Sequence, residues 1–373
     1  MNPLKKLNEH GQSFWLDFLS RGFLESGGLQ KLIDEDGLKG VTSNPSIFEK
    51  AIVDSKAYQA QITAAPTDLP IMTLYEQLAI SDIQQAADTL RPVYDALDGR
   101  DGFVSLEVSP SVAASTDATI AEGRFLWKSV DRENLMVKVP ATTAGLSAIR
   151  QLTSEGINVN VTLLFSQHVY EQVVEAYLAG LESLARETRD LSRIASVASF
   201  FVSRIDSEID KLLMIEIERT GNPDRRKTLE SLKGKVAIAN AKLAYRRYKD
   251  LFASARWQAL SEKGARTQRL LWASTSTKNA NYPDVLYVDE LIGADTVNTM
   301  PLKTIDAYRD HGAPRNSLEE NVTDAEATLK TLDEVGISLE SVAAKLLSDG
   351  VRSFAGSFAT LLGTIDSERK AQR

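Results

Sequence analysis

Residues 135–165 read LMVKVPATTAGLSAIRQLTSEGINVNVTLLF, and their pattern recurs along the chain. Two short apolar runs, Leu135–Val139 and Ile157–Phe165, flank a segment that we predict to be helical. A strand, a helix and a second strand in this order predict parallel strands joined by a right-handed crossover. Both runs also contain polar residues, although a parallel strand covered on both faces should be almost continuously apolar.

The same alternation of apolar runs and helical stretches continues on both sides of this segment. The other runs are Ser13–Leu19, Leu38–Ser43, Gly102–Val108, Ile194–Val202, Leu270–Ser274 and Thr296–Met300. The total of roughly eight is the number of strands that a closed parallel barrel requires. Between the runs, apolar residues recur at helical spacing, as they do from Tyr170 to Leu181.

We therefore expect a single domain of the α/β class. It should form a (β/α)8 TIM barrel over about residues 11–315, followed by a helical C-terminal extension over about 316–373. An open doubly wound sheet is the competing architecture, but the chain contains neither GxGxxG nor GxxxxGK(S/T). The long interval Asp206–Lys263 predicts several helices, and apolar residues from Leu339 to Phe354 predict a packing face on the extension.

The composition excludes several classes of function. With 43 Lys and Arg against 51 Asp and Glu, the net charge is −8, so we expect no nucleic-acid partner. The chain has no cysteine, which excludes disulfides and thiolate catalysis, and its three histidines form no HExxH motif. It has no signal-peptide-like start and no run of about 20 apolar residues, so we expect a cytoplasmic protein without a membrane partner.

In three of the predicted strands, the polar residues share one face. They are Ser105 and Glu107 in the first, Lys138 in the second, and Asn158, Asn160 and Thr162 in the third. Because successive side chains of a strand point to opposite faces, the apolar set should meet the helices and the polar set should point into the barrel. Burying charge is unfavourable, and polar groups at the carboxyl ends of barrel strands usually belong to the active site.

Each of these residues, taken alone, has a simpler interpretation. A lysine at the end of a strand can extend its ammonium group to solvent, and a lone glutamate in a strand is often exposed or paired. Asparagine and threonine often cap or fill turns. Because the pattern recurs on three strands, we favour a functional interpretation.

These residue types suit carbonyl chemistry. A lysine inside a dry barrel loses its charge more easily, and the neutral amine can attack a ketone to form an iminium. The iminium withdraws electrons, so the neighbouring carbon–carbon bond can break and leave an enamine. One carboxylate must accept the proton of the hydroxyl beyond that bond, and another can act with an ordered water during dehydration. Asp17 and Glu107 are the candidates for these two roles.

Six segments resemble the active-site motifs of the transaldolase family. They are GVTSNPSIF at Gly40–Phe48, SLEVSP at Ser105–Pro110, LMVKVPAT at Leu135–Thr142, NVNVTLLFS at Asn158–Ser166, ASFFVSRID at Ala198–Asp206 and WASTSTKN at Trp272–Asn279. They follow in chain order over roughly residues 11–301, and the length and helical tail resemble the longer transaldolase subfamily.

The resemblance implies reversible transfer of a dihydroxyacetone unit in the non-oxidative pentose phosphate pathway. Sedoheptulose 7-phosphate and glyceraldehyde 3-phosphate would give erythrose 4-phosphate and fructose 6-phosphate. Sugar phosphates would be the partners, and no metal or organic cofactor would be needed because the iminium is the electron sink. The sequence carries no signal for an oligomeric state.

The resemblance also implies a role for each matching residue. Lys138 would form the Schiff base, Asp17 would cleave and remake the C3–C4 bond, and Glu107 would act with Thr162 through a bound water. The substrate-binding residues would be Asn44 and Asn160 for hydroxyls, Ser199 and Phe201 at the donor end, and Arg204, Ser274 and Lys278 for the phosphate. The loop after Ser274 is longer than in other subfamilies and has Lys278 where those have arginine. Phe200 stands where many relatives have proline, for which the sequence gives no physical account.

Two other functions stay open. A fructose 6-phosphate aldolase would release free dihydroxyacetone, but such relatives tend to have glutamine in place of Glu107 and tyrosine in place of Phe201. A sugar-phosphate-binding barrel without catalysis would not need Lys138, Asp17 and Glu107 together. The residues present favour a transaldolase.

Overall fold

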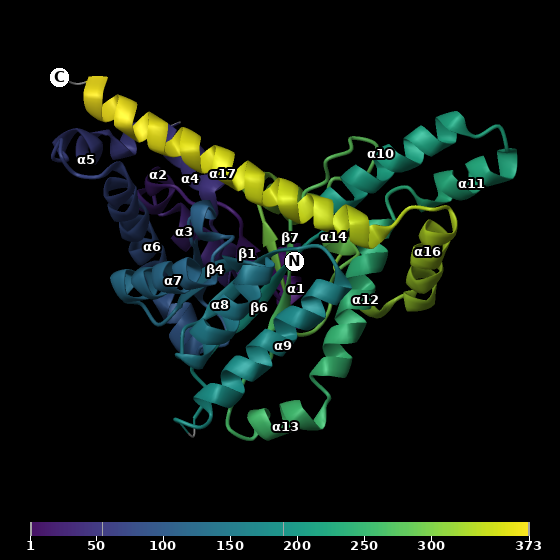
Figure 1. Ribbon diagram of the computed structural model, residues 1–373, viewed down its shortest axis with the longest axis horizontal. Coiled ribbons are helices and arrows are strands. Elements are labelled where there is room, and N and C mark those ends of the chain that lie inside the picture. The colour runs from purple at the N-terminus through teal and green to yellow at the C-terminus, as the bar shows by residue number, and fades with distance from the viewer. Residues whose placement is uncertain (1, 54, 189, 372–373) are drawn as a thin grey trace.

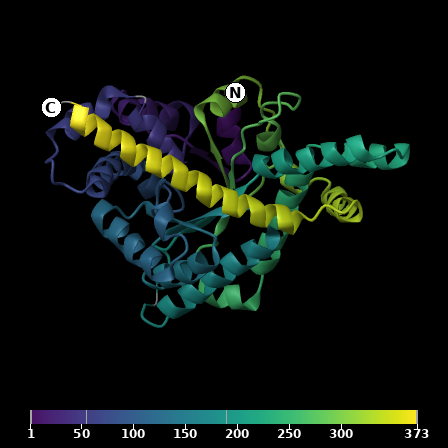
Figure 2. The same cartoon turned by 45° about the horizontal axis from the view of Figure 1, so that its top comes forward.

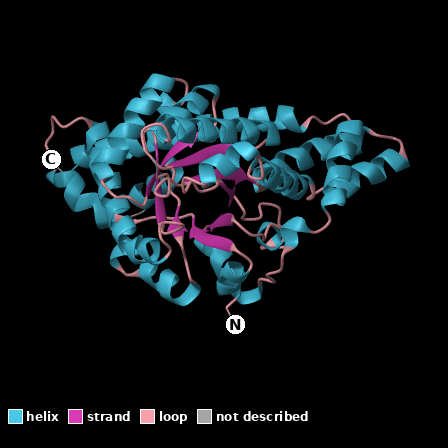
Figure 3. Cartoon of the chain, turned by 90° about the horizontal axis from the view of Figure 1, so that it is seen from below, coloured by secondary structure: helices cyan, strands magenta, loops and turns pink. Residues whose placement is uncertain are grey.

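The computed structural model describes residues 2–53, 55–188 and 190–371, which form a closed barrel of parallel strands inside a ring of helices (Figures 1 and 3). The strands are β1 Gln12–Leu16, β2 Gly40–Val41, β3 Phe103–Glu107, β4 Leu135–Pro140, β5 Val159–Leu164, β6 Ser196–Phe201, β7 Arg269–Ala273 and β8 Thr296–Met300. They pair in chain order, and β8 closes the barrel against β1. The predicted barrel is confirmed, and the open sheet is wrong.

Helices follow the strands as the alternating pattern predicts. Those up to β6 are α1 Pro3–Glu9, α2 Arg21–Glu25, α3 Gly28–Asp36, α4 Pro45–Val53, α5 Gln59–Ala64, α6 Ile71–Ala96, α7 Thr116–Val130, α8 Thr143–Ser154 and α9 Gln167–Leu184. Those after β6 are α10 Ser203–Arg219, α11 Pro223–Leu232, α12 Val236–Leu251, α13 Ala255–Ser261, α14 Leu286–Asp289, α15 Leu302–His311, α16 Val322–Glu334 and α17 Leu339–Ala371. Short 3-10 turns are η1 Lys56–Tyr58, η2 Pro110–Val112 and η3 Ser317–Glu319. None of the described helices is long and apolar enough to cross a membrane.

The strands begin and end at different residues from the predicted apolar runs. β1 ends at Leu16, so Asp17 lies directly after the strand, at the carboxyl end of the barrel. β5 contains an irregularity between Val161 and Leu164, where its register with β6 shifts. Within it, Leu163 has a φ of 59°, a left-handed conformation that bulky residues rarely adopt. The strict alternation predicted for this strand therefore ends before Leu163.

The amino-terminal end of the barrel is filled by one large side chain and a buried ion pair. Ser13 and Trp15 lie on the same face of β1, and the Trp15 indole donates a 2.7 Å hydrogen bond to Asp101 Oδ1. Arg269 of β7 reaches across to the same carboxylate, with Nη1 at 3.2 Å from Asp101 Oδ2 and 2.9 Å from Ser13 Oγ. A Cβ on Gly40 would lie 2.5 Å from the Trp15 ring, so only glycine fits there on β2.

The C-terminal extension ends in α17, a helix of 33 residues that crosses the end of the barrel formed by the carboxyl termini of the strands (Figures 1 and 2). Its buried residues are Val342, Ala343, Leu346, Gly350, Phe354, Phe358, Leu361 and Ile365. These include much of the predicted packing face. The helix contacts α4, α10 and β5, each of which carries or adjoins one of the segments that resemble family motifs. The last helix of the extension is therefore packed on the barrel.

We predict that Gly40→Ala destabilises the protein by about 1–3 kcal/mol, because its new methyl group overlaps the Trp15 ring. Gly356→Ala is the matched control. In the described part of the chain, its new methyl group would meet no atom within 4 Å outside the adjoining helix backbone, and alanine favours the helix by about 1 kcal/mol. Thermal or denaturant unfolding of both variants checks this prediction, and equal midpoints would contradict it.

Candidate active site

Lys138 lies on β4 with its side chain directed into the barrel. Its backbone is in register with Glu107 on β3 and with Asn160 on β5. The residue is only 4% exposed, and Nζ donates a 3.1 Å hydrogen bond to the carbonyl oxygen of Ser43. Glu107 Oε2 lies 3.6 Å from Nζ, so an amine and a carboxylate share one dry region of the barrel.

The carboxyl group of Glu107 has an unusually high pKa. Burial raises the pKa of its carboxyl to about 7, and the opposing attraction of Lys138 does not compensate for this effect. Among the described residues, Glu107 Oε2 and Thr162 Oγ1 are both buried and have no hydrogen-bond partner. The carboxylate oxygen can accept a hydrogen bond from a small polar molecule such as water, and the Thr162 hydroxyl can donate one.

Asp17 is anchored at the carboxyl end of β1. Its backbone N–H donates to the carbonyl oxygen of Met300 at 2.8 Å, and Thr42 Oγ1 donates to Asp17 Oδ1 at 2.7 Å. Burial raises the pKa of Asp17, while the positive charges of Lys138, Lys278 and Arg204 act in the opposite direction. The carboxylate thus faces the cations of the cavity and can accept or return a proton there.

Asn160 lies at the centre of a buried polar chain. Its Oδ1 accepts a 2.7 Å hydrogen bond from Ser199 Oγ on β6, and its Nδ2 donates a 2.9 Å bond to Ser105 Oγ on β3. The amide is fully buried, and both of its ends are bonded within the protein. Asn160 therefore lies below the floor of the cavity, where it orients Ser199 and Ser105 beside Lys138.

A cavity of about 370 Å³ opens above these residues. Eight predicted site residues line it, namely Asp17, Asn44, Lys138, Ser199, Phe201, Arg204, Ser274 and Lys278. The other three, Glu107, Asn160 and Thr162, are buried in the strands β3 and β5. The structure thus brings all eleven residues to one end of the barrel, in two layers.

The rim of the cavity is positively charged. Burial lowers the pKa of Arg204, whose Cζ lies 5.1 Å from the centre of the Phe201 ring and 6.0 Å from that of Phe354. Within the described residues, Arg204 forms no ion pair. Asp206, two residues later in the chain, accepts hydrogen bonds from Tyr287 and from the backbone of Ala237. The guanidinium therefore keeps donors available for an anion.

Two more polar groups complete this rim on the loop after β7. Ser274 has a φ of 57° and shares a 2.9 Å hydrogen bond between its hydroxyl and that of Ser203. Lys278 Nζ donates to Ser276 Oγ at 2.6 Å, and desolvation lowers its pKa. No cluster of three or more His, Cys, Asp or Glu residues suited to a metal ion occurs in the described part of the chain.

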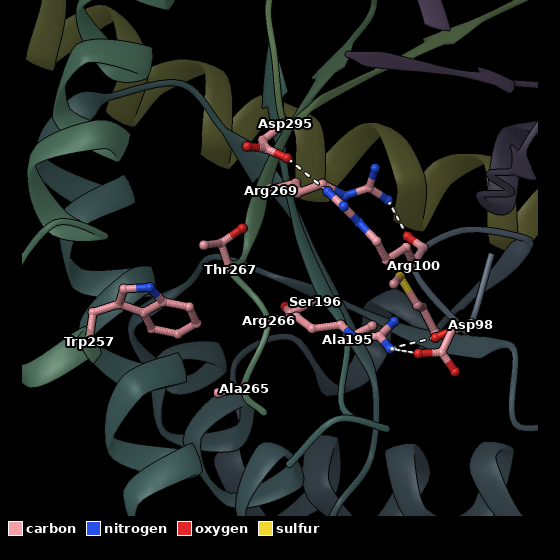
Figure 4. Close-up of a pocket in the computed structure, with 11 residues that line it drawn as sticks. Asp98, Arg100, Ala195, Ser196, Trp257, Ala265, Arg266, Thr267, Arg269 and Asp295 are labelled. Carbon is pink, nitrogen blue, oxygen red and sulfur yellow. Dashed lines mark hydrogen bonds and ion pairs between the residues drawn. The ribbon is translucent and has the colours of Figure 1, made fainter. Parts of the chain in front are cut away.

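A second cavity, of about 390 Å³, lies at the opposite end of the barrel and is rich in arginine (Figure 4). Its charges are paired within the protein. Arg100 lies 3.0 Å from Asp295, Arg266 lies 3.5 Å from Asp98, and the third guanidinium, of Arg269, bonds the buried Asp101 described above. Among the described residues, no lysine lines this cavity, so they do not provide it with the amine that iminium chemistry needs.

Comparison with known proteins agrees with this geometry. A model of the family described as transaldolase/fructose-6-phosphate aldolase matches residues 14–365. The chain belongs to the transaldolase/fructose-6-phosphate aldolase family.

Curated members of the family align with nearly the whole chain. A protein from Nostoc sp. strain PCC 7120 named transaldolase 2 is 48% identical over 99% of this chain and 98% of its own length. Proteins named transaldolase are 46% identical in Trichodesmium erythraeum, over 99% and 98%, and 48% identical in Acidothermus cellulolyticus, over 98% and 96%. The predicted family and the prediction of a transaldolase enzyme are confirmed.

Residues outside the family motifs also line the cavity of this transaldolase-family chain. Lys50 lies on α4, one helical turn after Ser46, and both line the cavity. Lys50 is four residues after Ser46 of the GVTSNPSIF motif, so both side chains lie on one face of the helix. This spacing could have predicted Lys50 as a site residue. Phe354 comes from α17 and is 150 residues away from Arg204 in the sequence, so no local pattern could have assigned it to the site.

The raised pKa of Glu107 predicts a pH-dependent contribution to stability. Between its ordinary pKa of 4.5 and about 7, the folded protein holds a proton that the unfolded chain has released, so stability falls as pH rises through this window. Glu107→Gln cannot titrate. From about pH 5 to about pH 8, the wild type should therefore lose more free energy of unfolding than this variant.

Denaturant unfolding of the wild type and Glu107→Gln at both pH values measures the difference. Two curves that fall in parallel with pH would contradict a raised Glu107 pKa.

Proposed function

We propose that this protein transfers a dihydroxyacetone unit between sugar phosphates through a Schiff base on Lys138. The single observation that supports this most strongly is the buried Lys138 amine, 3.6 Å from the Glu107 carboxylate, at the base of a cavity with a positively charged rim. The donor would be sedoheptulose 7-phosphate and the acceptor glyceraldehyde 3-phosphate. The products would be erythrose 4-phosphate and fructose 6-phosphate.

The first step joins the donor ketone to the enzyme. Nζ of Lys138 in its neutral form attacks C2 of the ketose, and the resulting carbinolamine loses its hydroxyl as water to give an iminium. Glu107 and Thr162 would hold a water molecule between their two unpartnered oxygen atoms and carry protons through it. A carboxyl with a pKa of about 7 can both donate and accept a proton near neutral pH.

The second step breaks the C3–C4 bond. Asp17 accepts the proton of the C4 hydroxyl, the bonding electrons move toward the iminium, and an aldose phosphate leaves while an enamine stays on Lys138. The acceptor aldehyde then enters, the enamine carbon attacks it, and Asp17 returns the proton to the new hydroxyl. Hydrolysis of the new iminium, again through Glu107, releases the product ketose and regenerates the amine.

The remaining side chains would recognise the substrate. Asn44 lines the cavity beside Lys138 and would bond hydroxyls of the three-carbon unit, while Asn160 would act from below through Ser199. Arg204, Ser274 and Lys278 would bind the phosphate group at the rim, since guanidinium and ammonium groups suit phosphate oxygens. Catalysis would need no metal or organic cofactor, and the reaction would serve the pentose phosphate pathway in the cytoplasm.

Lys138→Ala should lower turnover by roughly 10³-fold or more, because it removes the buried amine that would form the iminium. Borohydride with fructose 6-phosphate should add the mass of a reduced dihydroxyacetone unit or ketose to the wild type and not to this variant. The matched control is Lys330→Ala, which removes a 78% exposed lysine on α16 and should keep both activity and adduct.

Peptide mapping of the adduct and an assay without acceptor complete this test. An adduct on another lysine, or near-native transfer by Lys138→Ala, would refute the mechanism. Steady release of free dihydroxyacetone at the transfer rate would indicate the aldolase reaction instead.

Arg204→Ala should raise KM for phosphorylated donors about tenfold to a hundredfold with a smaller change in kcat, since it removes charge-assisted hydrogen bonds. Steady-state kinetics with fructose 6-phosphate, and inhibition by inorganic phosphate, measure the effect. A KM and a phosphate inhibition constant equal to those of the wild type would exclude Arg204 from the phosphate site.

A further inference from the structure

We infer that Phe354 of the C-terminal helix is a positioning residue for phosphate recognition, acting through Arg204. This inference rests on the proposed function, because it assigns a part to α17 in the same site. Phe354 lies far from every family motif in the sequence, is 4% exposed, and lines the cavity beside Arg204.

The guanidinium of Arg204 lies over two aromatic rings. Its Cζ lies 5.1 Å from the Phe201 ring centre and 6.0 Å from the Phe354 ring centre, both within the range of cation–π attraction. Phe201 belongs to β6, just before Arg204 in the chain, whereas Phe354 approaches from α17. Without the Phe354 ring, the guanidinium would lose one of its two aromatic contacts.

Aromatic rings hold an arginine differently from a carboxylate. A carboxylate would bond the N–H groups and compete with an incoming phosphate for the same donors. Ring faces attract the cation while leaving its N–H groups, which lie in the guanidinium plane, available for phosphate oxygens. Since no carboxylate pairs with Arg204 in the described residues, the two rings are suited to keep it oriented and open.

The position of Phe354 is fixed by contacts on both sides of it along α17. On the side toward the end of the helix, Ser357 shares a 2.8 Å hydrogen bond with Ser46 of α4, and the Phe358 ring packs edge-on against Tyr75 at 5.1 Å. On the other side, Lys345 forms a 3.1 Å ion pair with Glu208 of α10. The helix is therefore attached to α4 and to α10, which both contribute residues to the lining of the cavity.

One glycine lets the helix approach the barrel this closely. A Cβ on Gly350 would lie 2.8 Å from Leu163 Cδ2 and 3.6 Å from Arg204 Nη1. A glycine inside a helix is unfavourable by about 1 kcal/mol relative to alanine, but a larger side chain at position 350 would overlap Leu163. Close contact of α17 with the end of β5 and with Arg204 therefore depends on this glycine.

The decisive experiment separates the effect of the aromatic ring of Phe354 from the effect of its apolar bulk. Phe354→Leu keeps an apolar side chain but removes the ring, and Phe354→Tyr keeps the ring. Phe354→Leu should raise KM for fructose 6-phosphate and the inhibition constant of inorganic phosphate by about threefold to thirtyfold, with kcat within about twofold of the wild type. Phe354→Tyr should stay near wild-type values.

Two further variants distinguish positioning from general packing. Leu361→Ala removes a fully buried side chain of the same helix away from the cavity, and should lower thermal stability without changing the phosphate inhibition constant. In an Arg204→Ala background, Phe354→Leu should have no further effect on KM, because its influence passes through the missing guanidinium.

Each contrary result has a distinct meaning. Three results would overturn the role of Phe354 while leaving the transaldolase mechanism intact. They are an unchanged KM in Phe354→Leu, the same fold increase in KM whether or not Arg204 is present, and an equal increase in the phosphate inhibition constant in Leu361→Ala. An unchanged KM in Arg204→Ala would instead refute the proposed phosphate site, and the role of Phe354 with it.

Discussion

The burial of one amine beside one carboxylate is the constraint on which the rest of this structure depends. Lys138 and Glu107 lie in register on neighbouring strands, and both are almost completely shielded from solvent. A charged pair in such a place is unfavourable unless its partners are well fixed. The closed barrel fixes them, because every strand is hydrogen-bonded on both sides and none of the polar side chains can rotate away through an open edge.

The polar network around the amine has a consistent arrangement. Groups below the cavity, such as Asn160 with Ser199 and Ser105, are bonded to one another and are rigid. Other groups, such as Glu107 Oε2 beside Lys138 and the Arg204 guanidinium at the rim, have no hydrogen-bond partner within the described residues. This division between satisfied and available groups is what a preorganised site requires, since binding then replaces water and does not break internal bonds.

The sequence predicted the barrel and most of the site because both depend on local patterns. A period of two placed Glu107, Lys138, Asn160 and Thr162 on inward faces, and the family motifs added the residues at the strand ends. Local patterns did not predict the irregularity at Leu163, which breaks that period. Phe200, unexplained in the sequence, is fully buried with its ring edge-on to Trp272 at 6.1 Å, so it serves packing.

Phe354 could not be predicted at all from its surroundings, because its neighbour Arg204 is brought near only by tertiary packing. Lys50 could have been predicted more easily, because it lies one helical turn beyond a family motif.

The cavity above Lys138 also has a consequence for the kinetics. In the proposed reaction, the leaving aldose and the incoming aldose would carry the same kind of terminal anion and would compete for the same rim of cations. Alternating occupancy would follow, with each sugar acting as a substrate in one half-reaction and as an inhibitor in the other.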